Sequence, residues 1–184
     1  MAAAPETAVR ATPGRNRPVL GHLLHALNES AFSTRLRESD WTFSLIETLH
    51  VLSIAVMAGT IAIVDLRLLG VLCPQQRVSR LTTQVTPVTW IGFLLMVLSG
   101  ILLFVAQPEK NAANPAFQIK AALLLLAGVN LLIFHRFVFR DVAAWDARPR
   151  PPLAVRLCGG ASLTLWATII VLGRLIAYFP ETVA

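Results

Sequence analysis

The sequence predicts an all-α integral membrane protein, a four-helix transmembrane up-and-down bundle preceded by an amphipathic helix at the membrane interface. Of its 184 residues, 55% are hydrophobic and 14% are charged, and the mean hydropathy is +0.65. Soluble domains are roughly 25% charged. Four apolar segments each have close to the roughly 20 residues that cross a bilayer as a helix. They are residues 43–72, 88–106, 117–139 and 157–179.

The N-terminal part of the chain differs from the rest in composition. The first residues are rich in Ala, Pro and Arg without helical periodicity, which predicts a disordered tail. This tail lacks the apolar core of a signal peptide, so the first spanning helix is expected to direct insertion. Leu20, Leu23, Leu24 and Leu27 then follow helical spacing, which predicts a helix lying on the membrane surface. The expected domains are a tail at 1–18, an interfacial helix at 19–40 and a four-helix transmembrane domain at 41–180.

Capping residues and prolines predict where the spanning helices begin. Asp40 or Ser44 is the expected N-cap of the first spanning helix. Pro87 either opens the second helix or kinks it. Asn114 is the expected N-cap of the third helix, with Pro115 as its first residue.

The distribution of basic residues predicts the orientation of the protein. Most of the 16 Lys and Arg residues flank the apolar segments, so anionic lipid headgroups, and not nucleic acid, are the expected partner for the net charge of +6. The loops after the first and third helices are the richest in Arg, which places them in the cytoplasm. We therefore expect a multi-pass protein of the bacterial inner membrane with both termini in the periplasm. Cys73 and Cys158 then lie on the cytoplasmic side as thiols.

Ionisable side chains at membrane depth are the candidate functional residues, because such groups need a partner or a function in lipid. With a rise of about 1.5 Å per residue, His50 lies roughly 10 Å below the outer end of its helix and His135 roughly 20 Å or more below the outer end of its own. One haem between these two imidazoles is therefore not expected. The outer cluster comprises Glu47, His50, Lys120, Arg174 and Tyr178, and the inner cluster comprises Asp65, Arg67, His135, Arg136 and Trp90.

Each candidate also has a structural interpretation. Glu47 completes a capping box with Ser44, and His50 could form only a helix-to-helix hydrogen bond. Lys120 and Arg174 could extend to the headgroups. Gly and Ala positions along the helices indicate close packing or room for a flat cofactor. A di-iron site is excluded because Glu47-Thr-Leu-His50 has no second copy, and hydrolase and nucleotide-binding motifs are absent.

Several short motifs resemble known families. They are Glu47-Thr-Leu-His50, Asp65-Leu-Arg-Leu-Leu-Gly70, Thr86-Pro-Val-Thr-Trp90 and Asn114-Pro-Ala-Phe117-Gln-Ile-Lys120. Over residues 30–179 the chain resembles an uncharacterised family of small bacterial four-helix membrane proteins. More distantly, it is similar to the CopD-type copper-resistance membrane domain and to the bacterial membrane protoporphyrinogen oxidase. The resemblance implies a haem b ligated by His50, with Lys120 as the helix-three lysine, or copper handling. A second helix-one histidine is missing, which speaks against porphyrinogen oxidation.

Three hypotheses of function follow from these residues. The first is a haem-b protein with His50 as iron ligand and Lys120 and Arg174 at the propionates, transferring electrons with a quinone or a periplasmic redox protein. The second is copper transport or sensing through His50, Met57 and Met96, with a periplasmic copper protein as partner. The third is a non-catalytic membrane subunit or scaffold. Substrate, second axial ligand and oligomeric state stay open.

Overall fold

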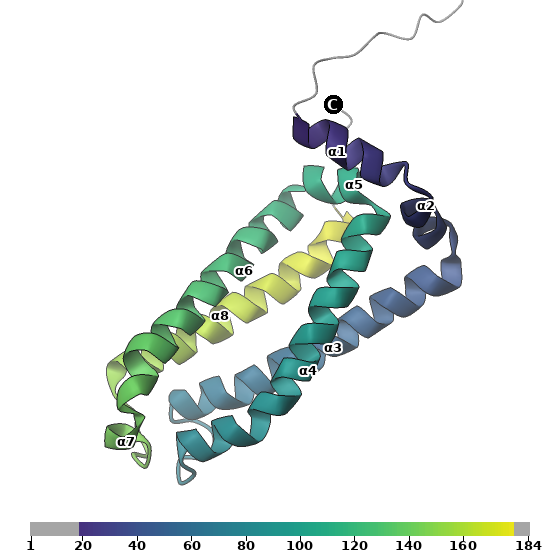
Figure 1. Ribbon diagram of the computed structural model, residues 1–184. Coiled ribbons are helices and arrows are strands. Elements are labelled where there is room, and N and C mark those ends of the chain that lie inside the picture. The colour runs from purple at the N-terminus through teal and green to yellow at the C-terminus, as the bar shows by residue number, and fades with distance from the viewer. Residues whose placement is uncertain (1–18, 179–184) are drawn as a thin grey trace, which may run out of the picture.

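The computed structural model describes residues 19–178, and this range is helical without strands. Four long helices dominate it, and each is long and apolar enough to cross a membrane (Figure 1). The protein is therefore a multi-pass membrane protein, and the predicted all-α four-helix bundle is confirmed. The predicted tail at 1–18 and the residues after 178 lie outside the described range. The long helices are α3 (Asp40–Leu68), α4 (Val78–Ala106), α6 (Pro115–Ile133) and α8 (Leu153–Leu175).

The four helices alternate in direction, and short helices mark the two ends of the bundle. One end carries α1 (Val19–Asn28), α2 (Ala31–Glu38) and α5 (Pro108–Ala113), and we call it the α5 end (Figure 1). The other carries α7 (Val142–Trp145) and is called the α7 end. Helix α3 packs against α4 and α8, and α6 packs against α8.

Helices α4 and α6 make contact only near the α5 end within the described part of the chain. There the rings of Phe104 and Phe117 stack with centroids 5.5 Å apart. Below this contact the two helices diverge toward the α7 end (Figure 1). Among the long helices that are neighbours in the bundle, α4 and α6 therefore pack least closely against each other (Figure 1).

The helix boundaries confirm part of the predicted capping and correct the rest. Ser39, and neither Asp40 nor Ser44, caps α3, because its hydroxyl accepts from the Thr42 amide. Asp40 instead lies in the first turn, where a carboxylate stabilises the positive end of the helix dipole. Asn114 caps α6 and Pro115 is its first residue, as predicted.

Pro87 lies inside α4, so the prediction that it opens this helix is wrong. The helix begins at Val78 because the backbone amide of Ser79 is held by the distant Asp146 carboxylate, at 2.8 Å. Pro87 has no amide hydrogen to donate to the carbonyl of Thr83, one turn earlier, so α4 lacks one helical hydrogen bond there. The polar segment before Pro87 is therefore helical, as expected for an extension of the second helix.

The predicted single interfacial helix at 19–40 is two helices. The chain breaks because Ser30 caps α2, its hydroxyl accepting from the Ser33 amide at 3.2 Å. Helix α2 then covers the end of α4: the Ser33 hydroxyl donates to the Val105 carbonyl at 2.8 Å, and Arg37 donates to the Ala106 carbonyl at 3.3 Å. These side chains satisfy carbonyls that the end of a helix leaves free.

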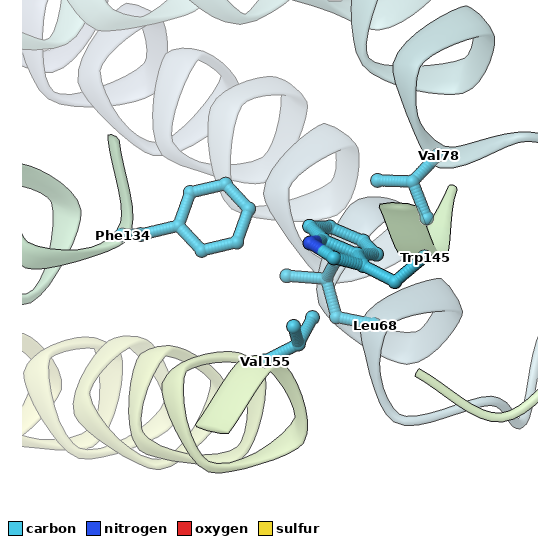
Figure 2. Packing of buried hydrophobic residues seen from close by; sticks show 5 residues of the cluster. All are labelled: Leu68, Val78, Phe134, Trp145 and Val155. Atoms are coloured by element: carbon cyan, nitrogen blue, oxygen red, sulfur yellow. The ribbon is translucent and has the colours of Figure 1, made fainter. Parts of the chain in front are cut away.

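A buried apolar cluster closes the α7 end. It consists of Leu68, Val78, Phe134, Trp145 and Val155, which converge from α3, α4, α8 and the segment after α6 (Figure 2). This segment passes through a π-helical turn, η1 (Phe134–Val138), and a 3-10 turn, η2 (Phe139–Asp141), before α7. The changes of helix type let Trp145 reach the cluster, which the predicted third segment at 117–139 did not include.

Arg67 connects the loops at the same end of the bundle. Its side chain is fully buried, and its Nε donates to the Gln76 carbonyl at 2.7 Å. Its Nη2 donates to the carbonyls of Asp146 and Arg148, at 3.5 and 3.1 Å. The predicted inner layer of ion pairs is thus replaced, for Arg67, by hydrogen bonds to backbone.

Candidate functional site

Helices α3 and α4 pack in a constant antiparallel register, which sets the level of every side chain on them. His50 contacts Ser99, Met57 packs on Gly92, and Thr60 contacts Thr89 at 2.8 Å. The spacing from one contact to the next is the same on both helices. The level of a residue on α3 therefore identifies its opposite residue on α4.

The hydrogen bonds of His50 determine which ring nitrogen carries the proton. His50 Nδ1 lies 2.9 Å from the Ser99 hydroxyl oxygen. That hydroxyl has its single proton directed to the backbone, with the Leu95 carbonyl 2.6 Å and the Met96 carbonyl 3.2 Å away, which leaves its oxygen to accept from His50. Nδ1 therefore carries the hydrogen, and Nε2 carries the lone pair. The Ser99 contact fixes this tautomer.

Two glycines make room for the side chains at this level. A Cβ on Gly100 would lie 3.1 Å from His50 Cε1, so the imidazole lies flat against the α4 backbone. A Cβ on Gly173 of α8 would lie 3.3 Å from Lys120 Nζ. The Lys120 side chain thus packs against α8 at Gly173, and it lines the same cavity as His50. Arg174 follows Gly173 on α8 and is exposed.

Four of the five residues of the predicted outer cluster line one cavity, whereas Tyr178 is exposed and is not among the lining residues. Glu47, His50, Lys120 and Arg174 all line one cavity of about 1740 Å³. The cavity runs along the bundle between the α3–α4 pair and the α6–α8 pair, with a mainly apolar wall. Trp90 and Leu125 also line it and are 62% and 76% exposed, so it opens through the gap between α4 and α6.

His135 lies at the other end of this cavity. It is exposed on the π-helical turn, its Nδ1 lies 3.2 Å from the Leu131 carbonyl, and its ring lies against Phe134 and Phe139. The structure does not bring it to His50. The two histidines lie at different depths, as the helix rise predicts.

Sequence reasoning missed several residues of the site. Ser99 and Gly100 appear in the sequence only as small residues of a packing surface, although Ser99 sets the His50 tautomer. Gly173 was not predicted to belong to the site, although it makes room for Lys120. The register between α3 and α4 was the information needed to pair Ser99 with His50, and one helix alone does not contain it.

The described residues offer few metal ligands. Within 19–178 no group of three or more His, Cys, Asp or Glu side chains is placed to hold a metal ion. On α1, His25 Nδ1 lies 3.2 Å from a carboxylate oxygen of Glu109 on α5. Met57 and Met96 line the cavity with His50. The free thiol of Cys158 lines it as well, so three sulfur-bearing side chains face this cavity.

A model for a family of unknown function (DUF6644) matches residues 41–179. The chain belongs to this family. The match covers all four long helices and the level of His50, and it leaves α1 and α2 outside. No curated protein and no solved structure matches the chain.

Proposed function

We propose that this member of the family is a haem-b-binding membrane protein that transfers electrons. The observation that supports the proposal best is the hydrogen bond from His50 Nδ1 to Ser99. Histidines that ligate metals usually donate from one ring nitrogen to a fixed acceptor, which orients the ring and leaves the other nitrogen for the metal. His50 lines the cavity in this state.

The cations at the same level suit the propionates of a haem. Lys120 and Arg174 line the cavity near His50, and Lys120 is partly withdrawn from solvent. Ion pairs with carboxylates are stronger where water is excluded, and a charge-assisted hydrogen bond adds to them. Glu47 is exposed one turn before His50, at the mouth of the cavity. Lys120 and Arg174 would hold the propionates, and Glu47 would lie beside them.

The cavity has the shape and chemistry for a large flat group. It holds about 1740 Å³, its wall is mainly apolar, and Gly100 and Gly173 make room for the side chains of His50 and Lys120. A bound haem would supply one-electron chemistry there, with its potential tuned by the ligand and the burial of the site. Of the four histidines in the chain, His50 is the one that would hold the haem iron at this level.

The setting that fits this function is the bacterial inner membrane, with the α5 end and both termini in the periplasm. The Arg-rich loops lie at the α7 end, which supports a cytoplasmic location for that end. The partner would be a periplasmic redox protein or a membrane quinone. The distant resemblance of His50, of Thr86-Pro87 and of Lys120 to the CopD-type domain and the membrane protoporphyrinogen oxidase would fit this function.

The experiment is reconstitution of the purified protein with haem, followed by absorption spectroscopy. Wild type and His135→Ala should both develop a Soret band at equal stoichiometry. His50→Ala should bind much more weakly or not at all. Equal haem binding by His50→Ala and wild type contradicts the proposal, and absence of binding in wild type does so as well.

Copper binding is the second candidate function. It is favoured by His50, Met57 and Met96 lining one cavity, since imidazole and thioether ligands suit Cu(I). Copper titration of His50→Ala and Met57→Leu tests it, because retention of full copper by both variants excludes these ligands. A protein that binds neither haem nor copper and co-purifies with a larger complex would favour the third hypothesis, a non-catalytic subunit.

A further inference from the structure

Two buried polar atoms at the α7 end of the cavity have no partner among the described residues. They are Oδ2 of Asp65 and Oγ1 of Thr82. Asp65 is 5% exposed, and its carboxyl contacts the Ser162 hydroxyl of α8. Both Asp65 and Thr82 line the cavity. Buried polar groups are nearly always hydrogen-bonded, so a pair without partners at one place requires an explanation.

The helix register places the two residues at nearly one level. The contact of Thr60 with Thr89 makes Gln84 the residue of α4 opposite Asp65. Thr82 precedes Gln84 by two residues in α4, which is an offset of about 3 Å along the helix axis. The two residues therefore form a pair on adjacent helices. This pair is separated from His50 by fifteen residues of α3, or about 22 Å.

An internal partner does not explain the pair. Arg67, the nearest cation in sequence, does not line the cavity: its Nε and Nη2 donate to the carbonyls of Gln76, Asp146 and Arg148, and its buried Nη1 has no partner among the described residues. Asn130 lines the cavity at the same end, but its amide donates to the Cys158 carbonyl at 3.2 Å. Asp65 and Thr82 therefore both line the cavity, and each has one buried oxygen without a partner among the described residues.

The cavity determines what kind of ligand this is. It opens between α4 and α6, where the exposed side chains Trp90 and Leu125 would meet lipid, so a ligand enters from the bilayer. Its mainly apolar wall requires an apolar body, and the two polar residues require a headgroup with hydrogen-bonding oxygens. Trp90 and Trp166 also line the cavity, and an aromatic headgroup would stack against their rings.

We propose that Asp65 and Thr82 form a binding site for the headgroup of a membrane quinone and its quinol. The Asp65 carboxyl hydrogen-bonds one ring oxygen, and the Thr82 hydroxyl contacts the same headgroup. The isoprenoid tail leaves through the opening between α4 and α6. The choice of a quinone among amphiphiles with oxygen-bearing headgroups rests on the proposed haem function, whereas the location of the site does not.

The test is equilibrium binding of decylbenzoquinone and its reduced quinol to the full-length protein in nanodiscs. Binding is followed by quenching of the tryptophan fluorescence, to which Trp90 and Trp166 contribute. Asp65→Leu and Thr82→Val should each weaken binding by about tenfold, the effect of losing one hydrogen bond to a buried group. Asp65→Asn and Thr82→Ser retain hydrogen-bonding groups and should bind close to wild type.

Matched controls separate this site from general effects and from the haem proposal. Thr83→Val removes a hydroxyl from the adjacent exposed position of α4, and Asp40→Asn alters a carboxylate on α3 outside the cavity; both should bind as wild type. His50→Ala should lose haem and keep quinone binding. The inference is overturned if Asp65→Leu and Thr82→Val bind both ligands as wild type does, whatever the outcome for haem.

Discussion

Replacing Ser99 with alanine should weaken haem binding through the His50 tautomer. Ser99 is 2% exposed, and its oxygen is the acceptor for His50 Nδ1–H at 2.9 Å. Without it, a partly buried N–H loses its partner and the ring is free to adopt the other tautomer. Leaving such a donor unsatisfied costs about 1–3 kcal/mol, which corresponds to about 5- to 150-fold in affinity. Ser99→Thr retains the hydroxyl and should largely restore binding.

Ser53→Ala is the matched control for this experiment. Ser53 is also buried between α3 and α4, and its hydroxyl donates to the Leu49 carbonyl at 2.6 Å, as that of Ser99 does to Leu95. It has no histidine partner among the described residues. Haem titration and thermal unfolding are measured for both variants. Equal haem affinity for Ser99→Ala and Ser53→Ala, at equal stability, refutes the role assigned to Ser99.

Three further predictions concern other contacts of the bundle. Lys120→Met should lower haem affinity by about tenfold or more, as expected for one lost charge-assisted hydrogen bond, and Lys120→Arg should recover part of it in the same titration. Gly92→Ala should destabilise the protein by about 1–3 kcal/mol in thermal unfolding, because the new Cβ would lie 3.0 Å from the Met57 backbone nitrogen. Gly59→Ala should leave the stability unchanged, because a Cβ at Gly59 would have no neighbouring atom within 4 Å. Arg67→Leu should cost at least about 2 kcal/mol by freeing buried carbonyls, whereas the exposed Arg80→Leu should leave the melting temperature unchanged.

Composition and hydropathy were sufficient to predict the number, order and direction of the long helices. A span of apolar residues is a local property, so the sequence alone contains it. Asn114 and Pro115 were likewise predictable, because a cap is determined by its own few residues. The depth arithmetic correctly separated His50 from His135, since helix rise is constant.

Tertiary contacts explain what the sequence did not predict. Ser30 splits the N-terminal helix because α2 gains hydrogen bonds to the end of α4, which no local pattern reveals. Trp145 extends the third span because it packs in the cluster with Leu68 and Val78. Arg67 was expected in an ion pair and binds loop carbonyls, whose positions depend on the folded loops.

The central claim is that the Nε2 lone pair of His50 ligates the haem iron, and imidazole rescue tests it most directly. Haem is titrated into His50→Ala and wild type with and without free imidazole, and the Soret band is recorded. We predict that His50→Ala loses the wild-type spectrum and that imidazole, entering the space left in the cavity, restores it. A wild-type spectrum in His50→Ala without imidazole would contradict the claim.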